Sequence, residues 1–247
     1  MELDATRFTK RRDSPVKGDG PMKKKSNGQY LENSRRGEIL VAAAALFRAK
    51  GYEASTIRDI TTAVGIASGS TFCHFRSKRE ILDAVAIEGM RHVLAGAEMV
   101  ANQDLTPENC LKVLIRQHIG FLHDPPSRDF VTVLLYETRA LSAGAKKEVM
   151  RLMALYEDIW KACLQGLVPV ANGRLRGAVS DSLLHRLLFG ALNWSVHWYS
   201  PDDDLPPEVL AEALAELVLP AMRGSAESDV DAVEKPFSSP LSGKKMA

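Results

Sequence analysis

Apolar residues recur three and four positions apart from about residue 35 to residue 223, and strict alternation of apolar and polar residues is almost absent. The first spacing is typical of a helix with one buried face, and alternation is typical of a strand. Glycine, proline, serine and threonine separate the apolar stretches, as expected at helix ends. The pattern therefore predicts an all-α protein with nine helices and short connections.

Four helices are expected in the first part of the chain, at residues 36–51, 56–64, 67–75 and 77–100. Gly51 and Gly65 end the first two, because glycine tolerates the backbone conformation that follows a helix. Ser55 or Thr56 caps the second helix. The fourth opens where Ser77 and Glu80 have the spacing of a capping box.

Five further helices are expected at residues 106–123, 129–141, 145–168, 180–200 and 208–224. A loop at 169–179 and a polar break at 201–207 separate the last three. The two helices around Gly65 have the pattern of a helix-turn-helix. Residues 68–74 carry mostly short side chains, which allow a helix to lie close to base edges in the major groove of DNA.

Charge is distributed unevenly, although the net charge is +1. Residues 1–34 carry 8 Lys and Arg against 5 Asp and Glu, residues 35–92 carry 9 against 6, and residues 93–247 carry 15 against 20. A basic first third favours a nucleic-acid surface. We expect residues 1–34 to form a disordered basic arm, which is either a DNA contact or a solvated tail, and residues 224–247 to form a disordered tail.

Composition excludes several other classes of protein. No apolar run reaches membrane-spanning length, and the first residues lack the apolar core of a signal peptide, so we expect a cytoplasmic protein without a membrane partner. No nucleotide-binding loop, zinc signature or nucleophile elbow is present, which argues against an enzyme. Cys73, Cys110 and Cys163 have no metal-binding spacing, and His118 and His123 lack an acidic partner at ligand spacing, so no metal is expected.

The stretch GYEASTIRDITTAVGIASGSTFCHFRSKREIL, at residues 51–82, resembles the DNA-binding domain of the TetR family of bacterial repressors. The resemblance extends over roughly residues 35–85 and implies a helix-turn-helix domain at 35–82, followed by a ligand-binding and dimerisation domain at 83–223. It implies phosphate contacts at the start of the second helix and after the third, and base contacts between them. The DNA-contacting residues implied are Thr56, Arg58, Ser68, Gly69, Ser70, Thr71, Phe72, His74 and Lys78.

The chain departs from the family pattern at several of these positions. Ser68 stands where Lys is common, and Phe72 stands where Tyr is common, so phosphate binding is weaker or the basic arm compensates. Thr71 stands where a larger apolar residue is common, which predicts an unusual target sequence. His74 has an alternative interpretation as a helix-end residue packed on Phe75.

Residues 190–219 resemble a TetR branch whose members often respond to acyl-CoA thioesters. The matching residues are Gly190, Leu192, Asn193, Trp194, Trp198 and Tyr199. The resemblance implies a small effector of the acyl-CoA type. Polar or amphipathic residues among apolar neighbours are candidates for its pocket: Tyr136, Arg139, Tyr156, Trp160, Asn193 and His197. Arg139 either binds an anionic ligand group or pairs with Glu137 or Glu148.

The last two expected helices carry wide apolar faces, which favour a four-helix interface between two copies of the chain. The leucine and valine residues in question are Leu183, Leu184, Leu187, Leu188, Leu192, Leu210, Leu214, Leu217 and Val218. The sequence therefore indicates a homodimeric repressor that binds a double-stranded DNA operator and is released by an effector. A co-repressor-dependent regulator or activator of the same fold, or a small-molecule binding protein that does not bind DNA, remains open.

Overall fold

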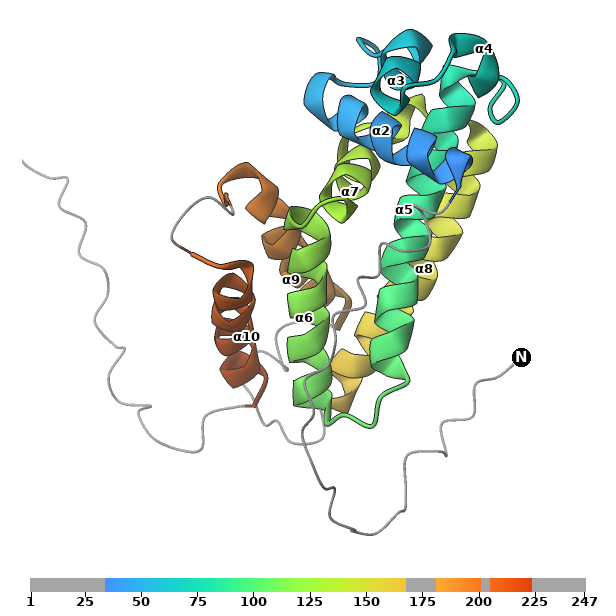
Figure 1. The fold of residues 1–247 in the computed structure, drawn as a ribbon. Coiled ribbons are helices and arrows are strands. Elements are labelled where there is room, and N and C mark those ends of the chain that lie inside the picture. Colours follow the sequence, from blue (N-terminus) through green and yellow to red (C-terminus); the bar gives the residue numbers. More distant parts are fainter. Residues whose placement is uncertain (1–33, 168–180, 201–204, 224–247) are drawn as a thin grey trace, which may run out of the picture.

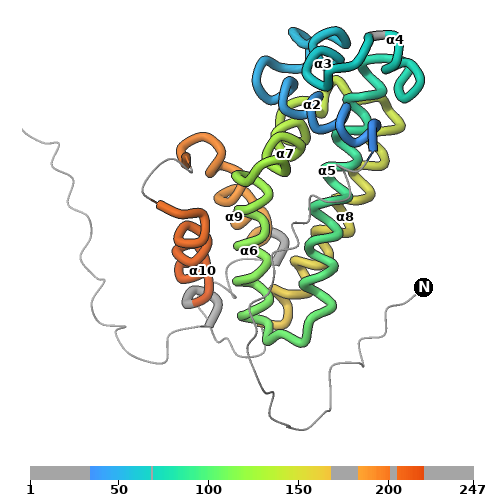
Figure 2. The backbone as a smooth tube through the Cα atoms, viewed as in Figure 1, coloured from blue at the N-terminus to red at the C-terminus, as the bar shows by residue number. Residues whose placement is uncertain are grey.

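The computed structural model describes residues 34–167, 181–200 and 205–223, and these residues form helices and no strand (Figures 1 and 2). The helices are α2 (Arg35–Lys50), α3 (Ile57–Val64), α4 (Ser68–Thr71), α5 (Lys78–Ala101), α6 (Pro107–His123), α7 (Ser127–Tyr136), α8 (Ala143–Gly166), α9 (Asp181–Trp194) and α10 (Pro207–Arg223). Short 3-10 helices follow α7 (Thr138–Ala140) and α9 (Ser195–His197). The predicted all-α class is confirmed.

Three expected helices are shorter than the sequence indicated. The expected helix at 67–75 is a single turn, α4, because the chain beyond Thr71 tightens and the amides of both His74 and Phe75 donate to the Thr71 carbonyl at 2.9 Å. The helices expected at 129–141 and 180–200 end at Tyr136 and Trp194, and each is followed by one 3-10 turn.

The expected loop at 169–179, the tail at 224–247 and all of the expected arm at 1–34 except Ser34 lie outside the described residues. Ser34 caps α2.

The head of the molecule, α2 to α4, packs against one end of the long helix α5 (Figure 1). Its core consists of fully buried side chains from all parts of this region, including Phe47, Ile60 and Phe75. Gly65 adopts a left-handed conformation, φ 71°, between α3 and α4, as expected for the turn of a helix-turn-helix.

The body comprises α5 to α10. The two 24-residue helices α5 and α8 lie side by side, and α10 packs on α6 (Figure 1). Gly96 lets α5 and α6 approach closely, because a Cβ atom there would lie 2.7 Å from the Phe121 ring. Among the described helices, none is long and apolar enough to cross a membrane. Helix α5 belongs to both parts, so the domain boundary expected at residue 82 stays a prediction.

Candidate DNA-binding surface and effector cavity

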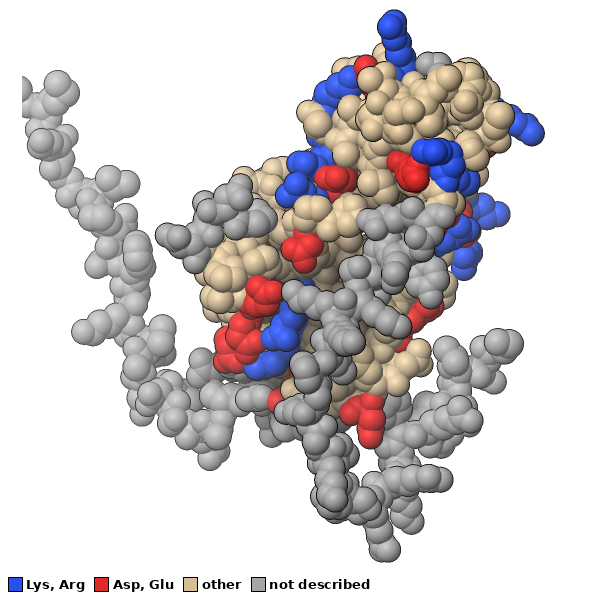
Figure 3. All heavy atoms as spheres, viewed as in Figure 1, with Lys and Arg blue, Asp and Glu red and all other residues tan. Residues whose placement is uncertain are grey.

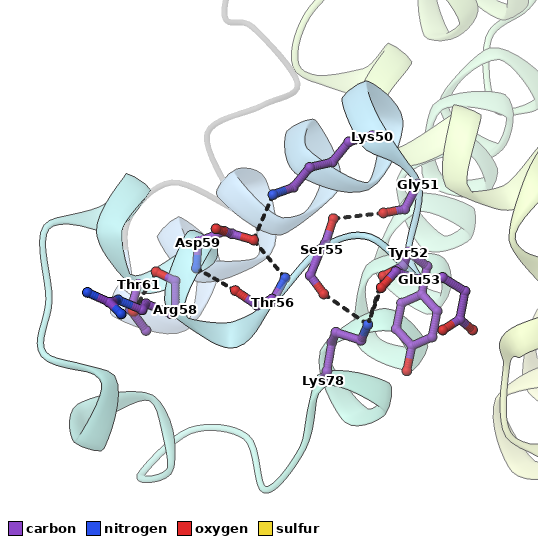
Figure 4. A network of polar contacts seen from close by, with 10 residues as sticks. All are labelled: Lys50, Gly51, Tyr52, Glu53, Ser55, Thr56, Arg58, Asp59, Thr61 and Lys78. Atoms are coloured by element: carbon purple, nitrogen blue, oxygen red, sulfur yellow. Dashed lines mark hydrogen bonds and ion pairs between the residues drawn. The ribbon is translucent and has the colours of Figure 1, made fainter.

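The first helix of the helix-turn-helix is anchored at its N-terminus (Figure 4). The Thr56 hydroxyl accepts a hydrogen bond from the Asp59 amide at 3.1 Å, and the Thr56 amide donates to the Asp59 carboxylate at 2.8 Å. Lys50, at the end of α2, lies 2.7 Å from the same carboxylate. The Lys50 hydrogen bond is the main reason that the pKa of Asp59 is lowered to about 2. These contacts fix the start of α3 relative to the end of α2.

In this structure Lys78 binds main-chain carbonyls of the head, and the phosphate contact that the resemblance implied stays a prediction. Its ammonium group donates to three main-chain carbonyls in the turn between α2 and α3, those of Tyr52 at 2.8 Å, Ser55 at 2.9 Å and Glu53 at 3.3 Å (Figure 4). The same group lies 4.2 Å from the centre of the Tyr52 ring. An ammonium group has three donors, and in this structure carbonyls of the head accept from all three.

Thr71 also has a role different from the one predicted. Its side chain is completely buried, so it faces the head core rather than base edges, and its hydroxyl oxygen has no hydrogen-bond partner among the described residues. The helix it ends is one turn long, and Phe75 beside it is buried too. Burial of these two residues leaves the opposite side of α4 exposed.

The exposed side of the head carries the remaining candidates. Thr56, Arg58, Gly69, Ser70, Phe72 and His74 are all exposed. The Phe72 ring is 56% exposed, which is unusual for a large apolar side chain. His74 is therefore not packed away beside Phe75. The side chain of Ser68 lies outside the description.

Two basic residues were missed by the sequence reasoning. Arg76 and Arg79 are exposed around the start of α5, close to His74 in the chain. Figure 3 shows Lys and Arg side chains around the edge of the head on the visible face. The run RSKR, at residues 76–79, is the available signal, but the resemblance assigned only Lys78 of this run to DNA.

Helix α7 connects the head to the body. Arg48 of α2 pairs with Asp129 of α7, and the Tyr52 amide donates to the Glu137 carboxylate, which follows α7, at 2.9 Å. The Asp129 side chain is only 11% exposed, which shields this ion pair from water. Both ends of α7 are thus tied to the head.

A cavity of about 460 Å³ lies in the body between α5, α6, α7, α8 and α9. Each helix contributes at least one large apolar side chain to its wall, among them Met90, Phe121, Leu134, Met153 and Phe189. The polar and charged residues of the wall are His118, Tyr156, Glu157, Lys161, His185, Arg186 and Asn193. An apolar cavity with a few polar groups has the usual form of a small-molecule site.

A hydrogen-bonded chain crosses one wall of the cavity. The Tyr156 hydroxyl lies 2.8 Å from Nδ1 of His118, and Nε2 of His118 lies 3.0 Å from Oδ1 of Asn193. Burial lowers the pKa of His118 to about 4 and raises the pKa of Tyr156, so both side chains are neutral near pH 7. Burial also lowers the pKa of His185 in the same cavity.

Only two of the six predicted pocket residues, Tyr156 and Asn193, line this cavity. Trp160 is fully buried and packs on Tyr156 without lining the cavity. The predictions for Tyr136, Arg139 and His197 are wrong for this cavity. Tyr136 and His197 are exposed and hydrogen-bonded to each other at 3.0 Å. Arg139 is exposed, and its expected pairs with Glu137 and Glu148 are not found among the described residues.

His118, His185, Lys161 and Arg186 are cavity residues that sequence reasoning did not select. His118 had been considered together with His123 only as a metal ligand. Instead, His123 is hydrogen-bonded to Ser195 at 2.8 Å, and within the described ranges no group of three potential ligands lies close enough to hold a metal ion.

Part of the expected dimer face is buried within the chain. Leu188, Leu192 and Leu210 are 5% exposed or less, because α9 and α10 pack on the body. An exposed apolar stripe remains on these helices: Leu183, Leu187, Trp194, Val209 and Leu217, with Trp198 just beyond α9. Exposed apolar side chains at helical spacing favour a protein interface.

Comparisons with known proteins match both parts of the chain. Residues 39–85 match the model of bacterial regulatory proteins of the tetR family, and residues 104–222 match the tetracyclin repressor-like C-terminal domain. A relative from Rhodococcus jostii strain RHA1, the HTH-type transcriptional repressor KstR2, is 29% identical over 191 residues, which cover 76% of this chain and 91% of that protein.

Solved structures have the same fold. The KstR2 structure from Mycobacterium tuberculosis has a TM-score of 0.66 and 26% identity, covering 76% of this chain and 94% of that one. AibR, solved with isovaleryl coenzyme A and operator DNA, has a TM-score of 0.67 and 20% identity, covering 76% and 99%. With a helix-turn-helix head on a helical body and both family domains matched, the chain belongs to the TetR family of DNA-binding transcription regulators.

Proposed function

We propose that this regulator is a homodimeric repressor that acts in the cytoplasm, without catalysis, and leaves its operator when an acyl-CoA thioester binds in the body cavity. One observation carries the proposal: the short helix α7 lines the cavity and is tied to the head near both of its ends. The relatives add support, since KstR2 is named a repressor and the AibR structure contains both isovaleryl coenzyme A and operator DNA.

The DNA-binding surface consists of the exposed residues at the start of α3 and around α4. Gly69, Ser70 and Phe72 lie closest to the bases, since they are exposed whereas Thr71 is buried. Thr56, Arg58 and His74 contact phosphates at the edges of this surface, and Arg76 and Arg79 add positive charge. Ser68 joins the set on the resemblance alone.

The effector cavity suits an amphipathic anion. Its volume of about 460 Å³ falls in the usual range for small-molecule sites and accommodates an acyl chain among apolar side chains. Lys161 and Arg186 in its wall provide positive charge for the phosphates of coenzyme A. Asp158 at 3.3 Å and Glu157 at 3.5 Å pair with Lys161 until an anion competes for it.

Helix α7 couples effector binding in the cavity to the position of the head. Val131, Leu134 and Leu135 face the cavity, whereas Asp129 and the following Glu137 hold α2 and the adjoining turn. A ligand that displaces the apolar side of α7 must shift or break the head contacts on its ends. The effector therefore lowers DNA affinity if it binds better to the displaced form.

Dimerisation uses the exposed stripe of α9 and α10. Leu183, Leu187 and Trp194 on α9, with Leu217 on α10, cover their apolar area by pairing with a second copy. A dimer sets two heads at a fixed spacing, as two successive major grooves require.

The DNA surface is tested by fluorescence anisotropy with DNA fragments that flank the gene. Arg58→Ala should weaken binding to all sequences and reduce the salt dependence, and Ser70→Ala should change base preference. Thr71→Val is the matched control, because a buried side chain should not alter base preference. Altered preference in Thr71→Val, with none in Ser70→Ala, would contradict this surface.

Effector titration separates the repressor from the alternatives. Release of DNA by CoA thioesters supports an effector-released repressor, whereas tighter binding indicates a co-repressor-dependent regulator. No salt-dependent DNA binding by the folded dimer would favour a small-molecule binding protein that does not act on DNA.

A further inference from the structure

Asn193 is distinctive in the cavity wall because only the oxygen of its side-chain amide is hydrogen-bonded to a described residue. Its Oδ1 atom accepts a hydrogen bond from His118, and its amide nitrogen makes no hydrogen bond with any described residue. Asn193 is part of the cavity lining and is half-buried. Two N–H groups are therefore available near the space that a ligand would occupy.

The structure places the oxygen of this amide toward the residues behind it. Oδ1 of Asn193 lies 3.0 Å from Nε2 of His118, and because an amide oxygen only accepts, Nε2 carries the single ring proton of neutral His118. Nδ1 of His118 then accepts a hydrogen bond from the Tyr156 hydroxyl at 2.8 Å. The amide nitrogen of Asn193 is the atom left for a ligand.

The surroundings make an unpaired amide costly. Side chains such as Met90, Phe121 and Phe189 surround the same space, and a ligand that fills it with hydrocarbon removes water from the Asn193 donors without replacing the hydrogen bonds. A ligand with an oxygen acceptor at this position avoids that loss. The cavity therefore discriminates between ligands that match in shape but differ in one oxygen atom.

We propose that Asn193 donates a hydrogen bond to a carbonyl oxygen of the effector, so that the cavity selects carbonyl compounds over hydrocarbon analogues of the same shape. The inference rests on the proposed effector role of the cavity and specifies which group the cavity recognises. The carbonyl belongs either to the thioester itself or to a keto group on the bound chain.

Two pairs of probes distinguish these sources. Octanoyl-CoA and S-octyl-CoA differ at the thioester carbonyl, and 2-octanone and 2-methyl-1-octene differ by replacement of a ketone oxygen with a methylene group. Calorimetric titration of the full-length dimer measures each dissociation constant. We expect the carbonyl compound to bind about tenfold more tightly in at least one pair, a ratio typical of one lost hydrogen bond in a buried site.

Asn193→Leu should reduce that ratio to about one, because leucine has a similar size and no donor. Met153→Leu, a change in another wall of the cavity, should keep the ratio. Asn193→Asp retains the acceptor for His118 and serves as a second variant if Asn193→Leu fails to fold; at pH 7 it should also lose the preference for the carbonyl.

The outcomes separate this inference from the proposed function. Preference for 2-octanone that depends on Asn193, without binding of either CoA compound, would support the inference and contradict the acyl-CoA proposal. DNA release by octanoyl-CoA with equal discrimination in wild type and Asn193→Leu would overturn the inference and leave the repressor proposal standing. Absence of carbonyl preference in the wild type, or of any binding, would also overturn the inference.

Discussion

At the scale of single residues, Lys78 stabilises the head by donating to three main-chain carbonyls in the turn between α2 and α3. Lys78→Met should lower the free energy of unfolding by on the order of 2 kcal/mol, since hydrogen bonds to a charged group are lost. Urea unfolding of the purified variant measures this change. Arg79→Met is the control, because Arg79 is exposed and forms no ion pair among the described residues. If Lys78→Met left stability unchanged and weakened binding to all DNA sequences alike, the result would instead support a phosphate contact by Lys78.

His118 makes stability depend on pH in a defined direction. Its pKa is near 6.5 in the unfolded chain and about 4 in the folded protein, so stability is fully present above pH 6.5 and falls as the pH is lowered toward 4. The loss approaches about 3 kcal/mol across this window, at about 1.4 kcal/mol per pH unit.

His118→Gln should reduce the slope of unfolding free energy between pH 6.5 and 4, as measured by urea unfolding at several pH values. Part of the slope should remain, because burial also lowers the pKa of His92, His123 and His185. Asp59 acts in a lower window, between about pH 4 and 2, where its carboxylate becomes protonated. An identical slope in the variant would show that His118 is not buried in neutral form.

The sequence predicts residue roles that depend on local neighbours, but it does not predict roles that depend on how helices pack. The turn at Gly65 and the cap at Thr56 are local, so a few neighbouring residues determine them. The capping box expected at Ser77 is only half formed: Ser77 accepts from Glu80, but the Glu80 carboxylate binds the Arg76 amide instead. Burial of Thr71 and the carbonyl contacts of Lys78 depend on how α4 and α5 pack against the rest of the head, which spacing does not reveal.

At the scale of elements, α7 is the part whose perturbation should uncouple the two sites. Arg48→Ala and Asp129→Ala should each weaken effector-induced DNA release by about threefold, and the double variant should show little further loss. The reason is that either change removes the same ion pair between α2 and α7. The test is a double-mutant cycle. DNA affinity is measured with and without octanoyl-CoA in the wild type, the two single variants and the double variant.

The free energies of unfolding of the same four proteins should give a coupling free energy of about 1 kcal/mol between Arg48 and Asp129. The value is modest because the Arg48 side chain is 39% exposed. Arg91→Ala is the control, because it removes one ion pair within α5, to Glu88, and one between α5 and α8, to Glu148, and neither involves α2. Fully additive effects on DNA release would contradict a role for α7 in coupling.

Helix positions were more predictable than pocket positions. Caps at Ser34, Thr106 and Ser142 accept hydrogen bonds at the starts of α2, α6 and α8, and such residues are visible in a sequence. The cavity is formed where the apolar faces of five helices meet, and each face looks like ordinary core. Tyr136 and His197 resembled pocket residues, but they bond to each other at the surface.

At the scale of the whole molecule, the proposed dimer predicts a sharp response to one charge. Leu187→Glu should convert the dimer to a monomer and lower DNA affinity at least tenfold, because Leu187 is 58% exposed in a single chain and buried charge is costly. Light scattering coupled to size-exclusion chromatography measures the mass. Met150→Glu, at a residue of α8 that is 70% exposed, should remain dimeric. A dimeric Leu187→Glu protein would place the interface elsewhere.

The most direct test combines both sites in one thermodynamic measurement. Anisotropy gives the affinity for a promoter fragment with and without saturating octanoyl-CoA, and calorimetry gives the affinity for octanoyl-CoA with and without that fragment. Coupling free energy is reciprocal, so both ratios should agree, with each ligand weakening the other by at least tenfold. Equal affinities in the presence and absence of the other ligand, or mutual strengthening, would contradict an effector-released repressor.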